Sequence, residues 1–326
     1  MTPAAKRRRV FAALRIASYV LALTFLAYEL WRVRHGLAAN LRLVGWWTAL
    51  VATLLAAAGG LPGFFGWRML LARLGTRLDR PTAVRLFFLA GLTRYLPGGI
   101  WPTVTHAALA RPLGEPPARL AGALGASQGL TVVAGLGIGL LALPRLVAAH
   151  AIWWVLVPIV AAALVPVAAP QLLTKLLGIA QRILRRSGPP ITLPGWRTLL
   201  AVTGLMTVGW LITGMHIMVL AVALGARPAG ALTVGTGGFA LSVVAGLFTV
   251  VMPGGLGIRE VVLALTLASL LTGPGLVTLI ALSRVLTTAA DLVSTAAVLG
   301  WLAWTGKGHS RSFHTAKQQP EGIRPS

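Results

Sequence analysis

Two hydrophobic runs of the chain are interrupted by the same turn, in VVMPGGLGIRE at 250–260 and in RYLPGGIWP at 94–102. Proline removes a backbone hydrogen-bond donor and glycine adopts conformations that other residues avoid, so each Pro-Gly-Gly breaks a helix. At membrane depth a broken helix is tolerated only where protein or a water-filled cavity covers the freed backbone groups. The sequence therefore predicts two broken or re-entrant helical hairpins, whose turns consist of Pro97, Gly98, Gly99, Pro253, Gly254 and Gly255.

Composition predicts that the rest of the chain also lies in a membrane. Of its 326 residues, 56% are hydrophobic and only 11% are charged, whereas a soluble domain has about 25% charged residues. The hydrophobic runs are roughly 10–31, 46–72, 82–101, 119–143, 151–169, 198–224, 229–252, 258–272 and 275–304. We expect an all-α, polytopic membrane helical bundle with about six full spans and two broken hairpins, which makes about eight hydrophobic crossings.

The net charge of +23 reflects membrane topology and not nucleic-acid binding, because the basic residues lie mostly at the ends of hydrophobic runs. Cytoplasmic loops of membrane proteins are enriched in Lys and Arg. This rule places both termini in the cytoplasm, although Arg32, Arg34 and Arg42 fall in the first outer loop. We expect a transmembrane domain over 1–305 and a disordered, basic cytoplasmic tail over 306–326.

The residue types needed for catalysis are scarce. The chain has no cysteine and only six acidic residues, and no pair of histidines has metal-ligand spacing. No Ser/His/Asp arrangement and no phosphate-binding loop is present. His106 and His216 are interpreted as packed or interfacial histidines and not as proton carriers. The sequence therefore predicts a protein that is not an enzyme, with no catalytic residue, no metal site and no cofactor.

The two interrupted runs resemble each other. Leu-Gly at 74–75 precedes the first Pro-Gly-Gly, and Leu-Gly at 224–225 precedes the second. The spans before the two breaks run in opposite directions in the predicted topology. This pattern is typical of an inverted repeat, whose paired breaks mark a binding site near the midplane. The alternative is chance recurrence, because the motif is short and the chain has 38 glycines.

Two acidic residues lie inside hydrophobic segments, each near an arginine. Glu260 follows Arg259, and Asp291 lies seven residues after Arg284. A charged side chain at the centre of a membrane helix costs about 2.5–3.5 kcal/mol on insertion scales, and such residues usually face the protein interior. They mark either a functional site or a buried ion pair that fixes helix packing.

The last hydrophobic run carries a polar stripe with helical spacing, formed by Arg284, Thr287, Thr288, Asp291, Ser294 and Thr295. Arg284 and Asp291 are about two turns, or roughly 10 Å, apart along the axis. We therefore expect that they do not pair directly and that Arg259 and Glu260 lie between them. In this arrangement Arg259 either contacts a bound phosphate or pairs with Asp291.

The segment 253–260 resembles the PGGLG-[VI]-R-E signature of the lysylphosphatidylglycerol synthase transmembrane, or flippase-like, family. The segment 94–102 is similar to that family's [KR]-Y-[IL]-P-G-x-[VI]-W element, and Arg284 matches the arginine that opens its last helix. The resemblance covers about residues 10–305. It implies a prokaryotic plasma-membrane protein that moves a lipid between leaflets, without the cytosolic aminoacyl-transfer domain of the full synthases.

The leading hypothesis is a membrane lipid flippase or lipid-linked transporter for an anionic, phosphate-bearing headgroup. The substrate would be a membrane phospholipid or an isoprenoid-linked lipid. Arg94, Arg259 and Arg284 would bind phosphate through their planar guanidinium groups, and Glu260 and Asp291 would orient or neutralise them. The alternative is a non-transporting anchor or regulatory partner of a membrane-bound lipid- or polysaccharide-modifying enzyme.

Overall fold

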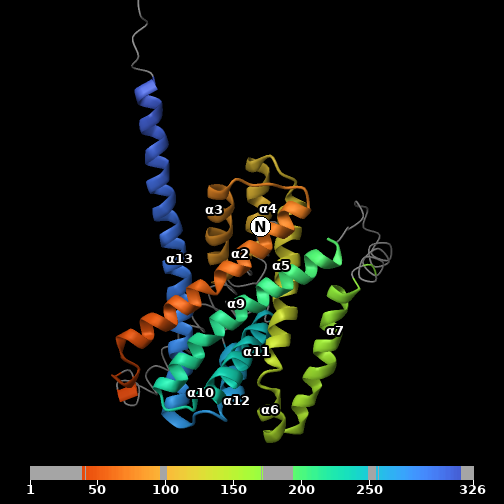
Figure 1. Ribbon diagram of the computed structural model, residues 1–326, viewed down its shortest axis with the longest axis vertical. Coiled ribbons are helices and arrows are strands. Elements are labelled where there is room, and N and C mark those ends of the chain that lie inside the picture. The colour runs from red at the N-terminus through yellow and green to blue at the C-terminus, as the bar shows by residue number, and fades with distance from the viewer. Residues whose placement is uncertain are drawn as a thin grey trace, which may run out of the picture.

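The computed structural model describes residues 39–40, 42–95, 101–169, 171, 194–248, 255 and 257–316, with side chains as far as residue 304. Over these residues the chain is all-helical and contains no β-strand (Figure 1). Several predicted features lie outside the described residues. They are the hydrophobic run 10–31, the tail beyond 316, and the break residues Pro97, Gly98, Gly99, Pro253 and Gly254.

The helices of the first half begin with a helical stretch at 42–58 that leads into α2. The elements that follow it are α2 (Gly60–Arg73), α3 (Arg80–Gly91), η1 (Leu92–Tyr95), α4 (Trp101–Ala110), η2 (Arg111–Leu113), α5 (Pro117–Gly139), α6 (Leu143–Ala149), η3 (Ala151–Val155) and α7 (Leu156–Ala168). Those of the second half are α9 (Trp196–Ala223), α10 (Pro228–Gly230), the π-helical η4 (Ala231–Gly235), α11 (Thr236–Leu247), α12 (Ile258–Leu267) and α13 (Gly273–Ala316).

Six helical segments of the described chain are long and apolar enough to cross a membrane. They are Arg42–Arg73, Pro117–Gly139, Ala151–Ala168, Trp196–Ala223, Pro228–Leu247 and Gly273–Trp304. Large apolar side chains such as Trp46, Val261 and Leu292 are exposed on these and neighbouring helices, as the hydrocarbon of a bilayer permits. The predicted polytopic, all-helical membrane class is therefore confirmed.

Helices α3, α4 and α12 have only 12, 10 and 10 residues. At about 1.5 Å per residue each spans roughly half of the 30 Å hydrocarbon core. Helices α3 and α4 pack against each other in one half of the molecule, and α11 and α12 pack against each other in the other half (Figure 1). We call these pairs the first and the second hairpin. Each contains one Pro-Gly-Gly break between its two helices.

Helices α2 and α9 run side by side in opposite directions and form the centre of the fold (Figure 1). Their backbones approach most closely where Gly59, just before α2, meets Gly209. A Cβ atom added to Gly209 would lie 2.8 Å from the carbonyl oxygen of Gly59, and one added to Gly59 would lie 2.9 Å from that of Gly209. Only glycine at both positions permits this crossing.

The same cap ends both central helices. After α2, Gly75 adopts φ +90° and the N–H of Thr76 donates to the carbonyl of Leu71. After α9, Gly225 adopts φ +96° and the N–H of Ala226 donates to the carbonyl of Ala221. A left-handed glycine with this 6→1 hydrogen bond is the Schellman motif, which satisfies the last carbonyls of a helix.

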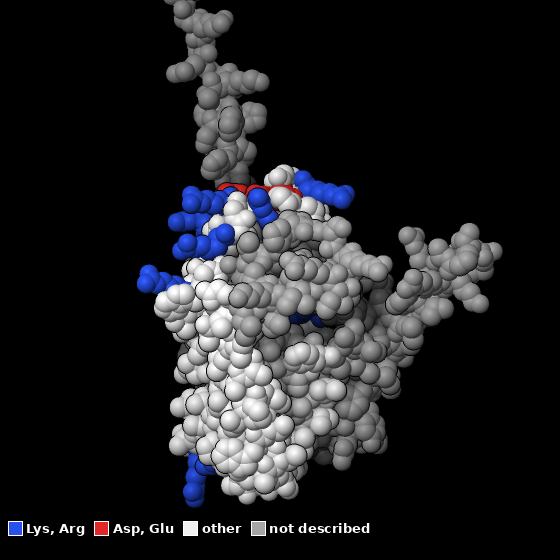
Figure 2. Space-filling model, turned by 90° about the vertical axis from the view of Figure 1, so that its right-hand side faces the viewer, with Lys and Arg blue, Asp and Glu red and all other residues white. Residues whose placement is uncertain are grey.

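Basic side chains gather at one end of the molecule, which we call the basic end, above a belt of uncharged residues (Figure 2). The loop after α2 is tied there to the loop before α5, because the Thr76 hydroxyl donates to Glu115 Oε2 at 2.6 Å and Arg119 lies 3.7 Å from the same oxygen. The exposed arginines of these loops are Arg73, Arg77, Arg80, Arg111 and Arg119. At the opposite end, Arg145 and Arg227 are exposed.

Helix α13 is 44 residues long and continues beyond the basic end (Figure 1). The segment from 306 to Ala316 is helical, whereas the sequence predicts disorder from 306 onward. Extension of an existing helix gains one backbone hydrogen bond for each residue added and does not incur the free-energy cost of nucleation again. The span therefore extends the helix into residues that would not form one alone.

Candidate functional site

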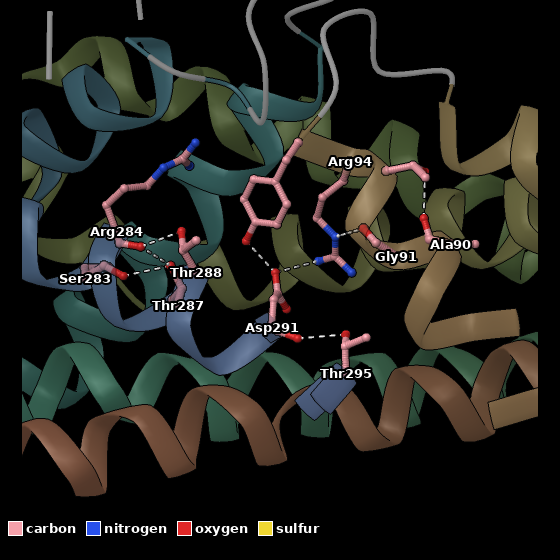
Figure 3. Close-up of polar contacts among 11 residues, drawn as sticks. Ala90, Gly91, Arg94, Ser283, Arg284, Thr287, Thr288, Asp291 and Thr295 are labelled. Atoms are coloured by element: carbon pink, nitrogen blue, oxygen red, sulfur yellow. Dashed lines mark hydrogen bonds and ion pairs between the residues drawn. The ribbon is translucent and has the colours of Figure 1, made fainter. Parts of the chain in front are cut away.

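Helix α13 contacts both hairpins through charged residues, and this place is the candidate site. On the side of the first hairpin, the Tyr95 hydroxyl donates to Asp291 Oδ2 at 2.6 Å, and Arg94 Nη1 lies 3.7 Å from the same oxygen. Arg94 also donates from Nε to the carbonyl of Gly91 at 2.8 Å, which holds the guanidinium toward α13 (Figure 3). Asp291 therefore joins the first hairpin to the last helix.

The second hairpin is also joined to α13 by an ion pair, but here the acid lies on the hairpin and the arginine on α13. Glu260 of α12 lies with Oε1 3.8 Å from Nε of Arg284. Its other oxygen, Oε2, accepts a hydrogen bond from the backbone N–H of Gly257 at 2.7 Å. Glu260 is the N3 residue of α12, and its carboxylate satisfies a free backbone donor at the start of the helix, as in one half of a capping box. Its carboxylate also suits the positive end of the helix dipole.

A close backbone contact fixes the second break against α11. Gly255 has φ +72°, and a Cβ atom added to it would lie 2.7 Å from Cα of Gly246. A Cβ atom added to Gly246 would in turn lie 3.3 Å from Cα of Gly255 and 3.5 Å from Cβ of Arg259. The two glycines therefore allow the break to touch α11 and place Arg259 beside it.

Arg259 differs from the other two arginines of the site in its partners. Its guanidinium carbon lies 5.1 Å from the centroid of the Phe239 ring of α11, which is cation–π distance. Among the described residues, no carboxylate lies within ion-pair distance of Arg259, and its guanidinium donates no hydrogen bond. The side chain is half-buried. Within the described part of the chain, Arg259 is therefore a cation held on an aromatic ring, and no acceptor occupies its N–H donors.

The site carries an excess of positive charge. Arg94, Arg259 and Arg284 supply three charges, and Glu260 and Asp291 remove two, which leaves one. The two ion pairs are 3.7 and 3.8 Å long, beyond hydrogen-bond distance. An incoming anion can therefore compete with each carboxylate for its arginine.

The predicted arrangement of the acids and arginines is right in part. As expected, Arg284 and Asp291 do not pair with each other, and Glu260 lies beside Arg284, with Oε1 3.8 Å from Nε. Asp291, however, pairs with Arg94 and Tyr95 of the first hairpin and not with Arg259. The sequence contains no indication of this pairing, because Tyr95 and Asp291 are 196 residues apart.

The hydroxyls of the predicted polar stripe turn back onto their own helix. Thr287 donates to the carbonyl of Ser283 at 2.7 Å, Thr288 to that of Arg284 at 2.9 Å, and Thr295 to that of Asp291 at 2.9 Å. Threonine in a helix often satisfies its hydroxyl in this way. The charged residues of the stripe therefore contact the hairpins, whereas its threonine hydroxyls donate to backbone carbonyls of α13 itself.

No protein-family model and no curated protein matches this sequence. Within the described ranges, no group of three or more His, Asp and Glu residues is placed to hold a metal ion. The argument for function therefore depends on the residues and geometry of the site.

Proposed function

We propose that this protein is a flippase, or a transporter of a lipid-linked molecule, that binds the phosphate of an anionic headgroup at Arg259. Arg94 and Arg284 flank this position. The observation that carries the proposal is the Arg259 guanidinium, which stacks on Phe239 and has no anionic partner among the described residues. Burial of a charge without a partner is costly, and a bound phosphate would compensate it.

Phosphate suits this site for chemical reasons. A guanidinium presents parallel N–H donors that match two phosphate oxygens, and these charge-assisted hydrogen bonds are stronger than neutral ones. The apolar helices around the site exclude water and weaken screening, which strengthens the attraction. The lipid tails would remain in the bilayer beside the exposed apolar side chains of α12 and α13.

The two ion pairs give a route by which binding opens the site. A phosphate that attracts Arg94 removes one of the two partners of Asp291, which leaves the Tyr95 hydroxyl to hold the first hairpin to α13 and so loosens this contact. A phosphate that attracts Arg284 does the same to Glu260 and the second hairpin. Because the hairpins occupy opposite halves of the molecule (Figure 1), release of one and then the other would expose the site to the two leaflets in turn.

An inverted repeat supports this mechanism and belongs to the proposal. Gly59 lies sixteen residues before Gly75, and Gly209 lies sixteen residues before Gly225. These equivalent glycines, one at the start of α2 and one within α9, contact each other at the crossing, as residues beside a two-fold axis do. Ala-Gly-Leu also precedes both breaks, at 90–92 and 245–247. Inverted repeats of this kind place the substrate between the halves.

The proposed topology follows from the repeat. With the run 10–31 as a span and both hairpins as re-entrant, the chain has about six full spans and two hairpins, or about eight hydrophobic crossings. The basic end would then face the cytoplasm, with both termini on that side. The resemblance to the lysylphosphatidylglycerol synthase transmembrane family agrees with a lipid substrate and with a prokaryotic plasma membrane.

A translocation assay tests the proposal. The purified protein is reconstituted into phosphatidylcholine vesicles that contain a fluorescent phosphatidylglycerol, and exchange between leaflets is followed with a membrane-impermeant quencher. We expect the wild type to accelerate exchange, Arg259→Gln to abolish the acceleration, and the matched variant Arg227→Gln, at an exposed site, to retain it. If the wild type gives no acceleration with any anionic lipid, the protein is instead a non-transporting anchor or partner.

A further inference from the structure

A buried histidine lies behind Arg259. His216 of α9 is fully buried, and its ring packs edge-on against Phe239 with centroids 4.7 Å apart. The same phenyl ring receives the Arg259 guanidinium at 5.1 Å. One aromatic ring therefore separates a titratable imidazole from the cation that binds the headgroup in the proposed function.

Both ring nitrogens of His216 have hydrogen-bond partners. Nδ1 contacts the carbonyl oxygen of Thr213, and Nε2 lies 2.9 Å from Oγ of Ser283. A carbonyl only accepts, so Nδ1 carries the proton, and Nε2 of the neutral ring accepts from the Ser283 hydroxyl. The hydroxyl can also turn and accept from a protonated Nε2. The same two partners therefore satisfy the ring in its neutral and in its charged form.

The other buried histidine lacks this arrangement. His106 has its Nδ1 2.8 Å from the carbonyl of Pro102, but its Nε2 has no hydrogen-bond partner within the described part of the chain. Its ring packs against Trp67 and contacts no charged group of the described segments. The sequence does not distinguish the two histidines. In the structure, His216 differs from His106 because both of its ring nitrogens have hydrogen-bond partners and a cation lies nearby.

Few charged groups face His216 from the elements around it. Arg259 lies across Phe239, and Arg284 follows Ser283 directly in α13, with Glu260 beside it. Helices α7 and α11 and the segment η4, which also pack against α9, contain no charged residue. The other charged residues of α9 and of the spanning parts of its neighbours are Arg68, Arg73, Arg119, Arg197 and Asp291. The four arginines lie toward the basic end, and Asp291 is held by the first hairpin.

We infer that His216 is a proton-binding site linked to the headgroup site, so that the protein takes up a proton when it binds an anionic headgroup. This inference rests on the proposed function. Burial of the imidazole and the positive charge of unoccupied Arg259 both oppose a charge on the ring, and a bound anion removes the second of these. The proton adds to the Nε2 lone pair, the Ser283 hydroxyl turns to accept it, and no other bond changes. Linkage is reciprocal, so protonation also strengthens anion binding.

Proton uptake during binding is measured by titrating the purified full-length protein, in a zwitterionic detergent, with dihexanoylphosphatidylglycerol. Calorimetry in two buffers of different ionisation enthalpy gives the number of protons taken up. We expect uptake of a fraction of a proton per bound probe, which increases as the pH falls from about 8 toward about 5. Over that range, affinity should rise up to about tenfold for each unit by which the pH falls.

Two variants assign the proton to its site. His216→Gln retains a donor and an acceptor without the titration, and we expect it to bind the probe without proton uptake. The matched control His106→Gln should take up protons as the wild type does. Absence of proton uptake in the wild type would overturn the inference even if His216→Gln does not fold.

The outcomes separate the two proposals. Probe binding without proton uptake in the wild type, or uptake that persists unchanged in His216→Gln, would overturn the inference and leave the proposed function standing. Absence of probe binding at every pH would instead overturn the proposed function, and the inference with it.

Discussion

The two hairpins hold their arginines in different ways. Arg94 of the first hairpin has a side chain that is 54% exposed and is held by a backbone carbonyl and a long ion pair. Arg259 of the second hairpin is half-buried against Phe239, beside a glycine–glycine contact that admits no side chain. In the proposed function, we interpret this difference as a division of roles, in which the second hairpin is a rigid platform for the headgroup and the first is a latch that can move.

Packing around the two hairpins agrees with this division. The first hairpin packs the rings of Phe87, Phe88 and His106 against those of Phe64 and Trp67 in α2. Side chains, and not backbone atoms, make these contacts. The second hairpin is instead closed by backbone contacts at Gly246 and Gly255 and by Gly238 against Thr266. Backbone contacts of this kind allow little movement, because no side chain can rearrange.

The two hairpins should open to opposite sides of the membrane. The largest difference that we expect between them is therefore in labelling from outside the cell. The chain has no cysteine, so single cysteines label without background. We expect Arg227→Cys, just before the second hairpin, to react with a membrane-impermeant thiol reagent in intact cells. Arg77→Cys, just before the first hairpin, should react only after permeabilisation. Equal labelling of both sites from outside would contradict the proposed orientation.

Conservative substitution of the two arginines should separate platform from latch. Lysine keeps the charge but loses the planar fork and part of the stacking. We expect Arg259→Lys to weaken binding of an anionic lipid about tenfold or more, since hydrogen bonds to charged groups contribute about 1.5–3 kcal/mol. Arg94→Lys should change affinity less than about threefold. Equal losses in an equilibrium titration would show that the two arginines share one role.

The glycines of the two hairpins should differ in their tolerance of alanine. Gly255→Ala places a methyl group against the backbone of Gly246 at positive φ, and we expect a loss of about 1–3 kcal/mol in the stability of the protein. Gly91→Ala meets only the flexible end of Arg94, at 3.2 Å, and should change stability by less than about 0.5 kcal/mol. Thermal unfolding in detergent measures both. A Gly255→Ala protein as stable as Gly91→Ala would refute the rigid platform.

Removal of one hydroxyl should loosen the latch alone. Tyr95→Phe deletes the donor to Asp291 and leaves the ring in place, at a cost of about 1–2 kcal/mol. We expect faster hydrogen exchange in α3 and α4, with exchange in α11 and α12 unchanged. Faster exchange in both hairpins would mean that they move as one body.

The smallest effect concerns the start of the first hairpin. Asp79 caps α3, and hydrogen bonding to the hydroxyl and N–H of Thr82 lowers the pKa of its carboxyl from 3.8. The cap therefore stabilises the hairpin fully above the unfolded-state pKa, and this contribution is lost as the pH falls through the lower folded-state pKa. Because Asp79 is exposed, Asp79→Ala should cost well under about 1 kcal/mol at neutral pH. Asp79→Asn should keep the cap and remove its loss at low pH, as thermal unfolding at pH 3 and pH 7 would show.

Sequence reasoning predicts the membrane fold, the two breaks and the intramembrane charges, because these depend on local composition and on proline and glycine chemistry. It does not predict which charges pair, since the partners of Asp291 lie on a hairpin almost two hundred residues earlier. Tyr95 could have been found from its place beside Arg94 in the first motif. Phe239 could not have been found in this way, because no neighbouring residue in the sequence marks it as different from the other aromatic residues of the chain. The role of Gly246 likewise appears only when α11 and the break are seen in contact.

The central claim is that Arg259 holds the phosphate of an anionic headgroup, and equilibrium binding to the purified protein tests it most directly. The affinities of dihexanoylphosphatidylglycerol and dihexanoylphosphatidylcholine are compared for the wild type, Arg259→Gln and the exposed control Arg227→Gln. The account predicts a preference of the wild type for the anionic lipid, a loss of about 10- to 100-fold in Arg259→Gln, and no change in Arg227→Gln. An Arg259→Gln protein that is folded and binds phosphatidylglycerol as tightly as the wild type would contradict it.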